Sequence, residues 1–157
     1  MTNNLYETLY SAKLGCYKLK ENAKLPTKGT VQSACFDLYA CLDAPLGLLP
    51  DERVLVPTGL VLDIPRGFSA RIHTRSGMAA KKGIGLSVSQ GIIDSDYVEE
   101  VFVPMRNNTN KHVHIYPGDR VAQLELVREI ITDVYETEER PEQKTDRDGG
   151  FGSTGVN

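Results

Sequence analysis

The chain has 157 residues and a mass of 17.3 kDa, a length that fits one domain with an adequate hydrophobic core. Its 40% hydrophobic and 25% charged residues are ordinary globular values, and its net charge of −3 excludes a generally basic nucleic-acid surface. The chain has no membrane-length apolar run, no signal-peptide pattern and only three cysteines without metal-binding spacing, so we expect a cytoplasmic protein in a reducing compartment that contacts neither membrane nor nucleic acid.

Short β-rich runs follow one another along most of the chain. We expect residues 1–14 to form a short leading segment or helix, and residues 78–82 to form one helical turn. Between turns marked by Pro, Gly, Asn and Asp, the pattern predicts strands at 54–56, 60–64, 69–74, 84–88, 101–105, 112–116, 121–127 and 130–135. Many short strands of this kind predict an all-β fold, either a sandwich, a jelly roll or a closed barrel.

The C-terminal end differs from the rest in composition. Residues 136–147 are charged, contain one proline and lack apolar periodicity, which predicts a flexible connector. We therefore divide the chain into a body, 1–135, and a C-terminal arm, 136–157. In the arm, four glycines surround Phe151, with Arg147 before them and the hydroxyls of Ser153 and Thr154 near the end. Such a tail cannot build a core, but its donors suit phosphate oxygens and its ring suits a flat ligand.

Residues 91–97 place two carboxylates and a phenol within four positions, from Asp94 to Tyr97. We read this segment as a tight turn or hairpin crown, and two interpretations remain open. It is either an Asx turn with a surface tyrosine, or the lip of a pocket. In the second case an Asp holds a water or a sugar hydroxyl, and Tyr97 packs on a sugar.

Residues 71–77 end a predicted strand and enter a turn. Arg71, His73 and Arg75 share one strand face because side chains alternate. This face is either solvated and cationic, or part of an anion site. In the anion site the Arg75 guanidinium makes a bidentate contact with phosphate, and Ser76 and Gly77 offer O–H and N–H donors.

Two further strand segments carry polar side chains. Gln123 follows the turn at Gly118 and is either an exposed amide or a donor to a phosphate oxygen. His112 and His114 alternate on one strand face, but the sequence supplies no third and fourth ligand for a metal.

Taken together, these segments resemble the trimeric dUTPase family over roughly residues 15–155. Five motifs carry the resemblance in order, and the third and fifth are highly specific. They are Ser33-Ala-Cys-Phe-Asp37-Leu-Tyr-Ala40, Pro65-Arg-Gly67 leading to Arg75-Ser-Gly77, Gly91-Ile-Ile-Asp94-Ser-Asp-Tyr97, Gly118-Asp-Arg-Val-Ala-Gln-Leu124, and Arg147 with Gly149-Gly-Phe-Gly-Ser-Thr-Gly155.

The resemblance implies a jelly-roll-like β-barrel that assembles as a homotrimer with exchanged C-terminal arms. It implies Mg²⁺-dependent hydrolysis of dUTP to dUMP and pyrophosphate, which supports nucleotide metabolism and prevents uracil incorporation into DNA. By the same resemblance, Asp94 activates the water that attacks the α-phosphorus, and Asp37 is an outer-shell candidate for Mg²⁺ or a partner of an arginine such as Arg120. Phe151 covers the uracil and Tyr97 excludes a 2′-hydroxyl. The substrate-binding residues it implies are Arg75, Ser76, Gly77, Val88, Gly91, Ile92, Ile93, Tyr97, Gln123, Arg147, Phe151, Gly152, Ser153 and Thr154.

The chain departs from the family pattern at a few positions. This chain has Cys35 and Glu99 where the family usually has glycine, Thr74 where it usually has proline, and Val88 where many bacterial members have asparagine. It also has one residue fewer between Arg147 and the first glycine pair of the arm. A dCTP deaminase, which shares the fold, is the alternative enzyme. A regulatory protein that uses a dUTPase body to bind another protein is the alternative from a different class.

Overall fold

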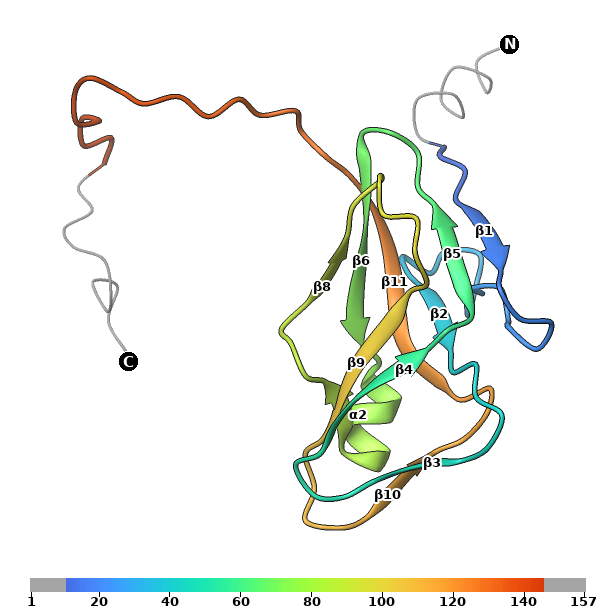
Figure 1. The fold of residues 1–157 in the computed structure, drawn as a ribbon. Coiled ribbons are helices and arrows are strands. Elements are labelled where there is room, and N and C mark those ends of the chain that lie inside the picture. Colours follow the sequence, from blue (N-terminus) through green and yellow to red (C-terminus); the bar gives the residue numbers. More distant parts are fainter. Residues whose placement is uncertain (1–10, 146–157) are drawn as a thin grey trace.

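The computed structural model describes residues 11–145, which form short strands and one short helix (Figure 1). The expected all-β class is therefore confirmed. Within residues 11–145, no helix is long and apolar enough to cross a membrane. The elements are β1 (Gly15–Lys18), β2 (Phe36–Tyr39), β3 (Leu46–Leu48), β4 (Arg53–Pro57), β5 (Leu60–Asp63), β6 (Phe68–Thr74), α2 (Ser76–Lys82), β7 (Ile84–Leu86), β8 (Gly91–Ile93), β9 (Phe102–Asn107), β10 (Val113–Ile115) and β11 (Arg120–Arg128).

The strands form four antiparallel sheets. One sheet has the order β2-β11-β6-β8 and another β4-β9-β7, while β1 pairs with β5 and β10 with β3. The long strand β11 is central because it pairs with β2 on one side and β6 on the other. Its residue Gln123 lies opposite both Asp37 and His73. This pairing brings together segments that are 86 residues apart in the chain.

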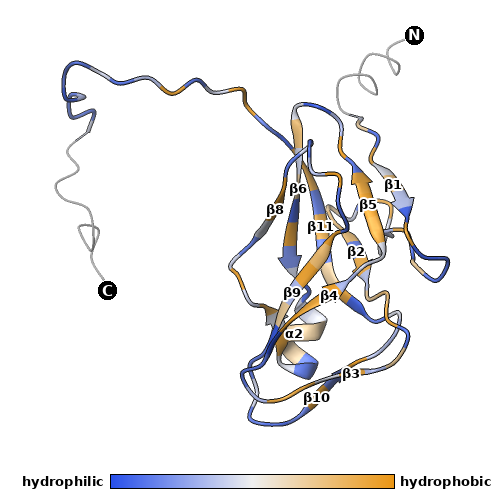
Figure 2. Cartoon of the chain, in the orientation of Figure 1, coloured by the Kyte–Doolittle hydropathy of each residue, from blue (hydrophilic) through white to orange (hydrophobic). Residues whose placement is uncertain are grey.

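The sheets enclose one main apolar core. Alternation along the strands turns Leu38, Ile72 and Leu124 inward from one sheet, and Val56 and Met105 inward from another. Each such buried side chain contributes about 1.5–3 kcal/mol relative to an exposed one. Figure 2 shows the hydrophobic colouring concentrated on strands such as β4, β5 and β9. The core therefore holds the polar strand ends described below in a rigid frame.

Most of the predicted strands are confirmed, with ends that move by one or two residues. The turn expected at 78–82 is the longer helix α2. Three strands of three or four residues, β1, β2 and β3, were missed because segments this short become strands only through their partners β5, β11 and β10. Residues 1–10 of the expected leading helix lie outside the described part, and residues 11–14 have no regular structure.

One prediction was confirmed only in part, and another was wrong. The segment read as a tight turn begins with a strand, because Gly91–Ile93 pairs with β6 and only the residues after it turn. The strand predicted at 130–135 is not formed, since no described strand lies beside it to accept its hydrogen bonds. This segment instead runs away from the body (Figure 1), and Ile130, Ile131, Val134 and Tyr135 are 80–96% exposed.

Candidate active site

A buried carboxylate organises one polar site at the end of the four-stranded sheet. Asp37 on β2 is only 6% exposed. Its Oδ1 accepts from Arg75 Nε at 3.1 Å and from Gln123 Nε2 at 3.5 Å, and its Oδ2 accepts from Arg120 Nη1 at 3.2 Å. Three segments predicted separately, at 33–40, 75–77 and 118–124, therefore meet at one carboxylate. We call Asp37, Arg75, Arg120 and Gln123 the Asp37 cluster.

The backbone around the Asp37 cluster explains how these side chains reach one another. Arg75 follows the end of β6 and precedes helix α2, which begins with Ser76 and Gly77. An added Cβ at Gly77 would lie 2.9 Å from Arg75 Nη1, so glycine leaves room for the guanidinium. A register shift between Arg120 and Ala122 on β11 sets the direction of Arg120.

The Asp37 cluster borders a cationic cavity. The cavity has a volume of about 200 Å³ and is lined by Arg75, Gly77, Met78, Lys81, Lys82, Asp119 and Arg120. Lys82 donates to Asp119 at 2.7 Å, and Lys81 adds a further cation. Four cationic side chains thus face two carboxylates, Asp37 and Asp119, which leaves positive charge for an anion.

A second cavity, of about 230 Å³, lies beside β8. It is lined by Ile72, Gly91, Ile92, Ile93, Asp94, Tyr97, Val101 and Phe102. An added Cβ at Gly91 would lie 3.1 Å from Ile72 Cβ, so a side chain there would crowd the wall. Asp94 is exposed, and Tyr97 is 41% exposed. We call this cavity the Asp94 pocket.

The Asp37 cluster and the Asp94 pocket lie at opposite ends of β6. Ile93 pairs with Ala70, so Asp94 follows at the level of Ser69, whereas Arg75 follows the last residue of the strand. At about 3.4 Å per residue, the two levels are on the order of 20 Å apart. The chain therefore does not bring the predicted phosphate-binding and water-activating residues together by itself.

The remaining side chains of the predicted cationic face are paired with carboxylates. Arg71 Nη2 contacts Glu129 Oε1 at 2.7 Å, and His73 Nε2 contacts Glu125 Oε2 at 3.0 Å. Hydrogen bonds from the Ser69 hydroxyl and from Arg71 lower the pKa of Glu129. Of Arg71, His73 and Arg75, Arg75 alone lines the cationic cavity.

Several predicted residues fall elsewhere. Val88 is exposed in the bend after β7 and does not line the Asp94 pocket. Arg147, Phe151, Gly152, Ser153 and Thr154 lie outside the described residues. The sequence reading omitted Ile72 and Phe102 from the pocket, and Lys81 and Lys82 from the cationic cavity. Lys81 and Lys82 follow Arg75 by about two helical turns, and that spacing was the available signal.

Removing the Asp37 carboxylate is expected to destabilise the fold. Asp37→Ala leaves Arg75 and Arg120 without the acceptor between them, and should lower the free energy of unfolding by about 1–3 kcal/mol. Urea unfolding at neutral pH measures this change. Asp43→Ala is the control, because Asp43 is 79% exposed and lies 3.6 Å from Lys20, a pair expected to contribute at most about 1 kcal/mol. Equal losses in the two variants would contradict a structural role for the Asp37 cluster.

Comparison with known proteins identifies relatives over most of the chain. The family model described as dUTPase matches residues 21–155. A deoxyuridine 5′-triphosphate nucleotidohydrolase of a Wolbachia sp. from Drosophila simulans is 47% identical over 138 residues, which cover 86% of this chain and 89% of that protein. One from Hydrogenobaculum sp. is 42% identical over 92% of this chain and 99% of the relative.

Solved structures share the fold. The Staphylococcus bacteriophage 80alpha dUTPase with dUPNHPP superposes with a TM-score of 0.80 at 24% identity, over 93% of this chain and all of that one. A variant dUTPase of phage phi11 of S. aureus has a TM-score of 0.72 at 22% identity, over 82% of this chain and 98% of that one. The phi11 protein coordinates a structural Mg(II) ion.

Proposed function

Because this chain belongs to the dUTPase family and is a dUTP diphosphatase, we propose that its active site is assembled from several copies of the chain. In this proposal the Asp37 cluster of one copy holds the phosphates, and the Asp94 pocket of a neighbour holds the nucleoside and the attacking water. The arm of a third copy, with Phe151 and Arg147, covers both. The assembly is a homotrimer.

The separation along β6 carries this proposal. A group that activates water must lie within about 3 Å of the reacting atoms, or one water away. Asp94 and Arg75 are on the order of 20 Å apart within one chain, so the two cannot serve the same phosphate there. The Asp94 pocket is also smaller than the roughly 300–1,000 Å³ of a typical ligand pocket, which leaves walls for other copies to supply.

At the phosphates, we assign binding to Arg75, Ser76, Gly77 and Gln123. Arg75 already points its guanidinium across Gly77, and each charge-assisted bond to phosphate contributes about 1.5–3 kcal/mol. Asp94 accepts a proton from the water and directs its oxygen at the α-phosphorus. The new bond joins that oxygen to the α-phosphorus, and the bond to the bridging oxygen breaks. dUMP and pyrophosphate result.

At the nucleoside, we assign recognition to the backbone of Gly91, Ile92 and Ile93 and to the ring of Tyr97. A strand edge presents N–H and C=O groups to uracil, and a close backbone wall excludes a 5-methyl group. Tyr97 lies under the deoxyribose and leaves no room for a 2′-hydroxyl. Val88 lies outside the Asp94 pocket within one chain, and its apolar side chain offers uracil no hydrogen bond.

Mg²⁺ fits the site as an ion held mainly by the substrate's phosphates. Within residues 11–145 no group of three or more His, Cys, Asp or Glu side chains can hold a metal. An ionised carboxylate has about four acceptor positions, so Asp37 can accept from its arginines and still accept from a metal-bound water. Mg²⁺ prefers such sites, with few carboxylates and several waters. When bound, it would neutralise charge on the phosphates.

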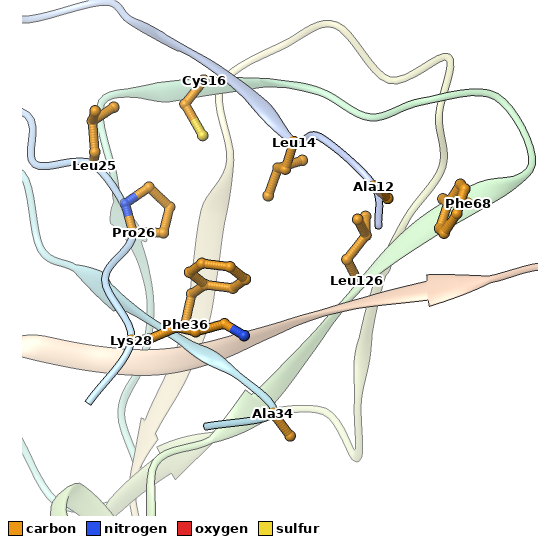
Figure 3. A pocket seen from close by; sticks show the side chains of 10 residues that line it. All are labelled: Ala12, Leu14, Cys16, Leu25, Pro26, Lys28, Ala34, Phe36, Phe68 and Leu126. Carbon is orange, nitrogen blue, oxygen red and sulfur yellow. The ribbon is translucent and has the colours of Figure 1, made fainter. Parts of the chain in front are cut away.

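Two exposed apolar surfaces suit contacts between copies of the chain. The first is the segment 130–135, whose large apolar side chains are exposed to solvent. The second is a groove of about 500 Å³, toward which Leu14, Phe36, Phe68 and Leu126 point (Figure 3). Exposed apolar patches that are rimmed by polar residues mark interaction sites. We assign the groove of one copy to the 130–135 segment of its neighbour.

A substrate panel tests the proposed reaction. The purified protein with Mg²⁺ is expected to release pyrophosphate from dUTP, and little from UTP, dTTP or dCTP. Ammonia release from dCTP would instead identify the deaminase reaction. Absence of both products would contradict an enzymatic role and favour the alternative of a regulatory protein that binds another protein.

Deleting residues 147–157 tests the role of the arm. Loss of Phe151 stacking, which is worth about 1–3 kcal/mol, should lower kcat/KM for dUTP by about 10- to 100-fold. Far-UV circular dichroism and size-exclusion chromatography should remain those of the full chain, because the truncated chain keeps every residue of the described core. A truncated protein that fails to fold or assemble would show that the tail is structural.

A further inference from the structure

The loop that carries Asp94 and Tyr97 is closed on itself by its aromatic residue. The Tyr97 hydroxyl donates to the Glu100 carbonyl at 2.9 Å, and the Tyr97 N–H donates to the Asp94 carbonyl at 3.2 Å. Tyr97 is thus tied to one end of the loop by its hydroxyl and to the other by its backbone, while its side chain lines the Asp94 pocket. Its position therefore depends on where Glu100 is held.

Glu100 is held by the turn between β4 and β5. Its Oε1 accepts the N–H of Gly59 at 2.8 Å. The next residue, Val101, donates to the Leu60 carbonyl at 2.8 Å and accepts the Thr58 hydroxyl at 2.7 Å. Thr58 and Val101 are buried, and Glu100 is half-buried. The Glu100 carboxylate thus adds a side-chain bond to the bonds of Val101, and it holds the Glu100 end of the pocket loop against a turn 41 residues earlier in the sequence.

The turn at Gly59 is a rigid attachment point. Gly59 has a φ of 67°, in the left-handed region that favours glycine. An added Cβ would lie 2.7 Å from Cys41 Sγ and 2.8 Å from Ala23 Cβ, so the backbone is packed directly against its neighbours. Its carbonyl also accepts the Leu19 N–H at 2.8 Å. A bond to Gly59 therefore fixes Glu100 relative to the core.

The neighbouring Glu99 provides a contrast on the same loop. It is exposed, and within residues 11–145 it has no hydrogen bond or ion pair. Its φ is not positive, because the only positive value for a described non-glycine residue is at Asp51. Glutamate in place of the family's glycine at 99 therefore causes no backbone strain. The two adjacent carboxylates differ in role, since only that of Glu100 is bonded.

We propose that Glu100 is a positioning residue for sugar selection: through Gly59 it fixes the loop that presents Tyr97 to the deoxyribose. This inference rests on the proposed function of Tyr97. Steric rejection of a 2′-hydroxyl requires a wall that does not yield, and discrimination is a difference between two affinities. A loop released from Gly59 lets the ring move, so the ribonucleotide gains access while the deoxyribonucleotide loses a contact.

The test compares kcat and KM for dUTP and UTP in four variants. Glu100→Ala is expected to lower the ratio of kcat/KM for dUTP to that for UTP by about tenfold, on the scale of one hydrogen bond to a charged group, with the dUTP change mainly in KM. Glu100→Gln keeps an oxygen acceptor for Gly59 and should hold the ratio within about twofold of wild type. Glu99→Ala, the matched control, should leave it unchanged. Tyr97→Ala should lower the ratio at least as much as Glu100→Ala.

The ratio separates positioning from stability. Partial unfolding reduces the active fraction equally for both substrates, so it leaves the ratio unchanged. An unchanged ratio in Glu100→Ala, or an equal fall in Glu99→Ala, would overturn the role of Glu100 while leaving that of Tyr97 intact. An unchanged ratio in Tyr97→Ala would instead overturn the proposed function of Tyr97 and, with it, the premise of this inference.

Discussion

Asp94→Asn is expected to lower kcat for dUTP by about 10²- to 10⁴-fold, the range for loss of a general base, while dUTP still binds. A carboxylate at this position accepts the proton of the attacking water directly. Asparagine has nearly the same shape, but it carries no charge to attract that proton. Pyrophosphate release measures turnover, and calorimetric titration of the variant with dUTP measures binding.

Asp96→Asn is the matched control for Asp94→Asn. Asp96 lies two residues further on the same exposed loop but does not line the Asp94 pocket. We expect its kcat to stay within about threefold of wild type, because a surface charge outside the site acts only weakly. Retained turnover in Asp94→Asn, or an equal loss in both variants, would show that another residue positions the water.

A mixture of two inactive chains is expected to recover activity. Asp94→Asn and Arg75→Ala each disable every site in their own assemblies. If each site takes Asp94 from one copy and Arg75 from another, random mixing in equal amounts gives both intact residues in about a quarter of sites of a symmetric oligomer. The two chains should be unfolded and refolded together, and pyrophosphate release should approach about a quarter of the wild-type rate.

Two controls give this experiment its meaning. Each variant refolded alone should stay inactive, and a chain carrying both substitutions should rescue neither single variant. Size-exclusion chromatography verifies that the mixture has assembled. If every site lies within one chain, the mixture has no intact site, so the absence of recovery in an assembled mixture would contradict the shared site.

The sequence alone was sufficient to predict the family of this protein and its fold class. Turn residues and alternating apolar runs predicted most of the strands, because these signals are local. The order of the five motifs identified the family and selected Asp94, Tyr97, Arg75 and Gln123 as candidates. Those selections depend on residue type and spacing, which are visible without coordinates.

The missed features depend on contacts between distant segments. Strand β2 exists because β11 pairs with it, and the 130–135 segment is not a strand because the described chain offers it no partner. The sequence left Asp37 either as an outer-shell candidate for Mg²⁺ or as a partner of an arginine. Only the structure shows that Asp37 pairs with Arg75 and Arg120. Local sequence patterns cannot show which distant segments pair, because the pairing register is set by packing of the whole core.

By itself, the sequence determined which groups are available: the carboxylate of Asp94, the guanidinium of Arg75, the ring of Tyr97 and a glycine-rich arm with one aromatic residue. Only the tertiary structure decided where they lie, with Asp94 and Arg75 at opposite ends of β6 and Glu100 bonded to Gly59. The physical reason is that side-chain chemistry belongs to single residues. The distances between these groups are set by the antiparallel strand registers and the packed core, which bring together residues far apart in the chain.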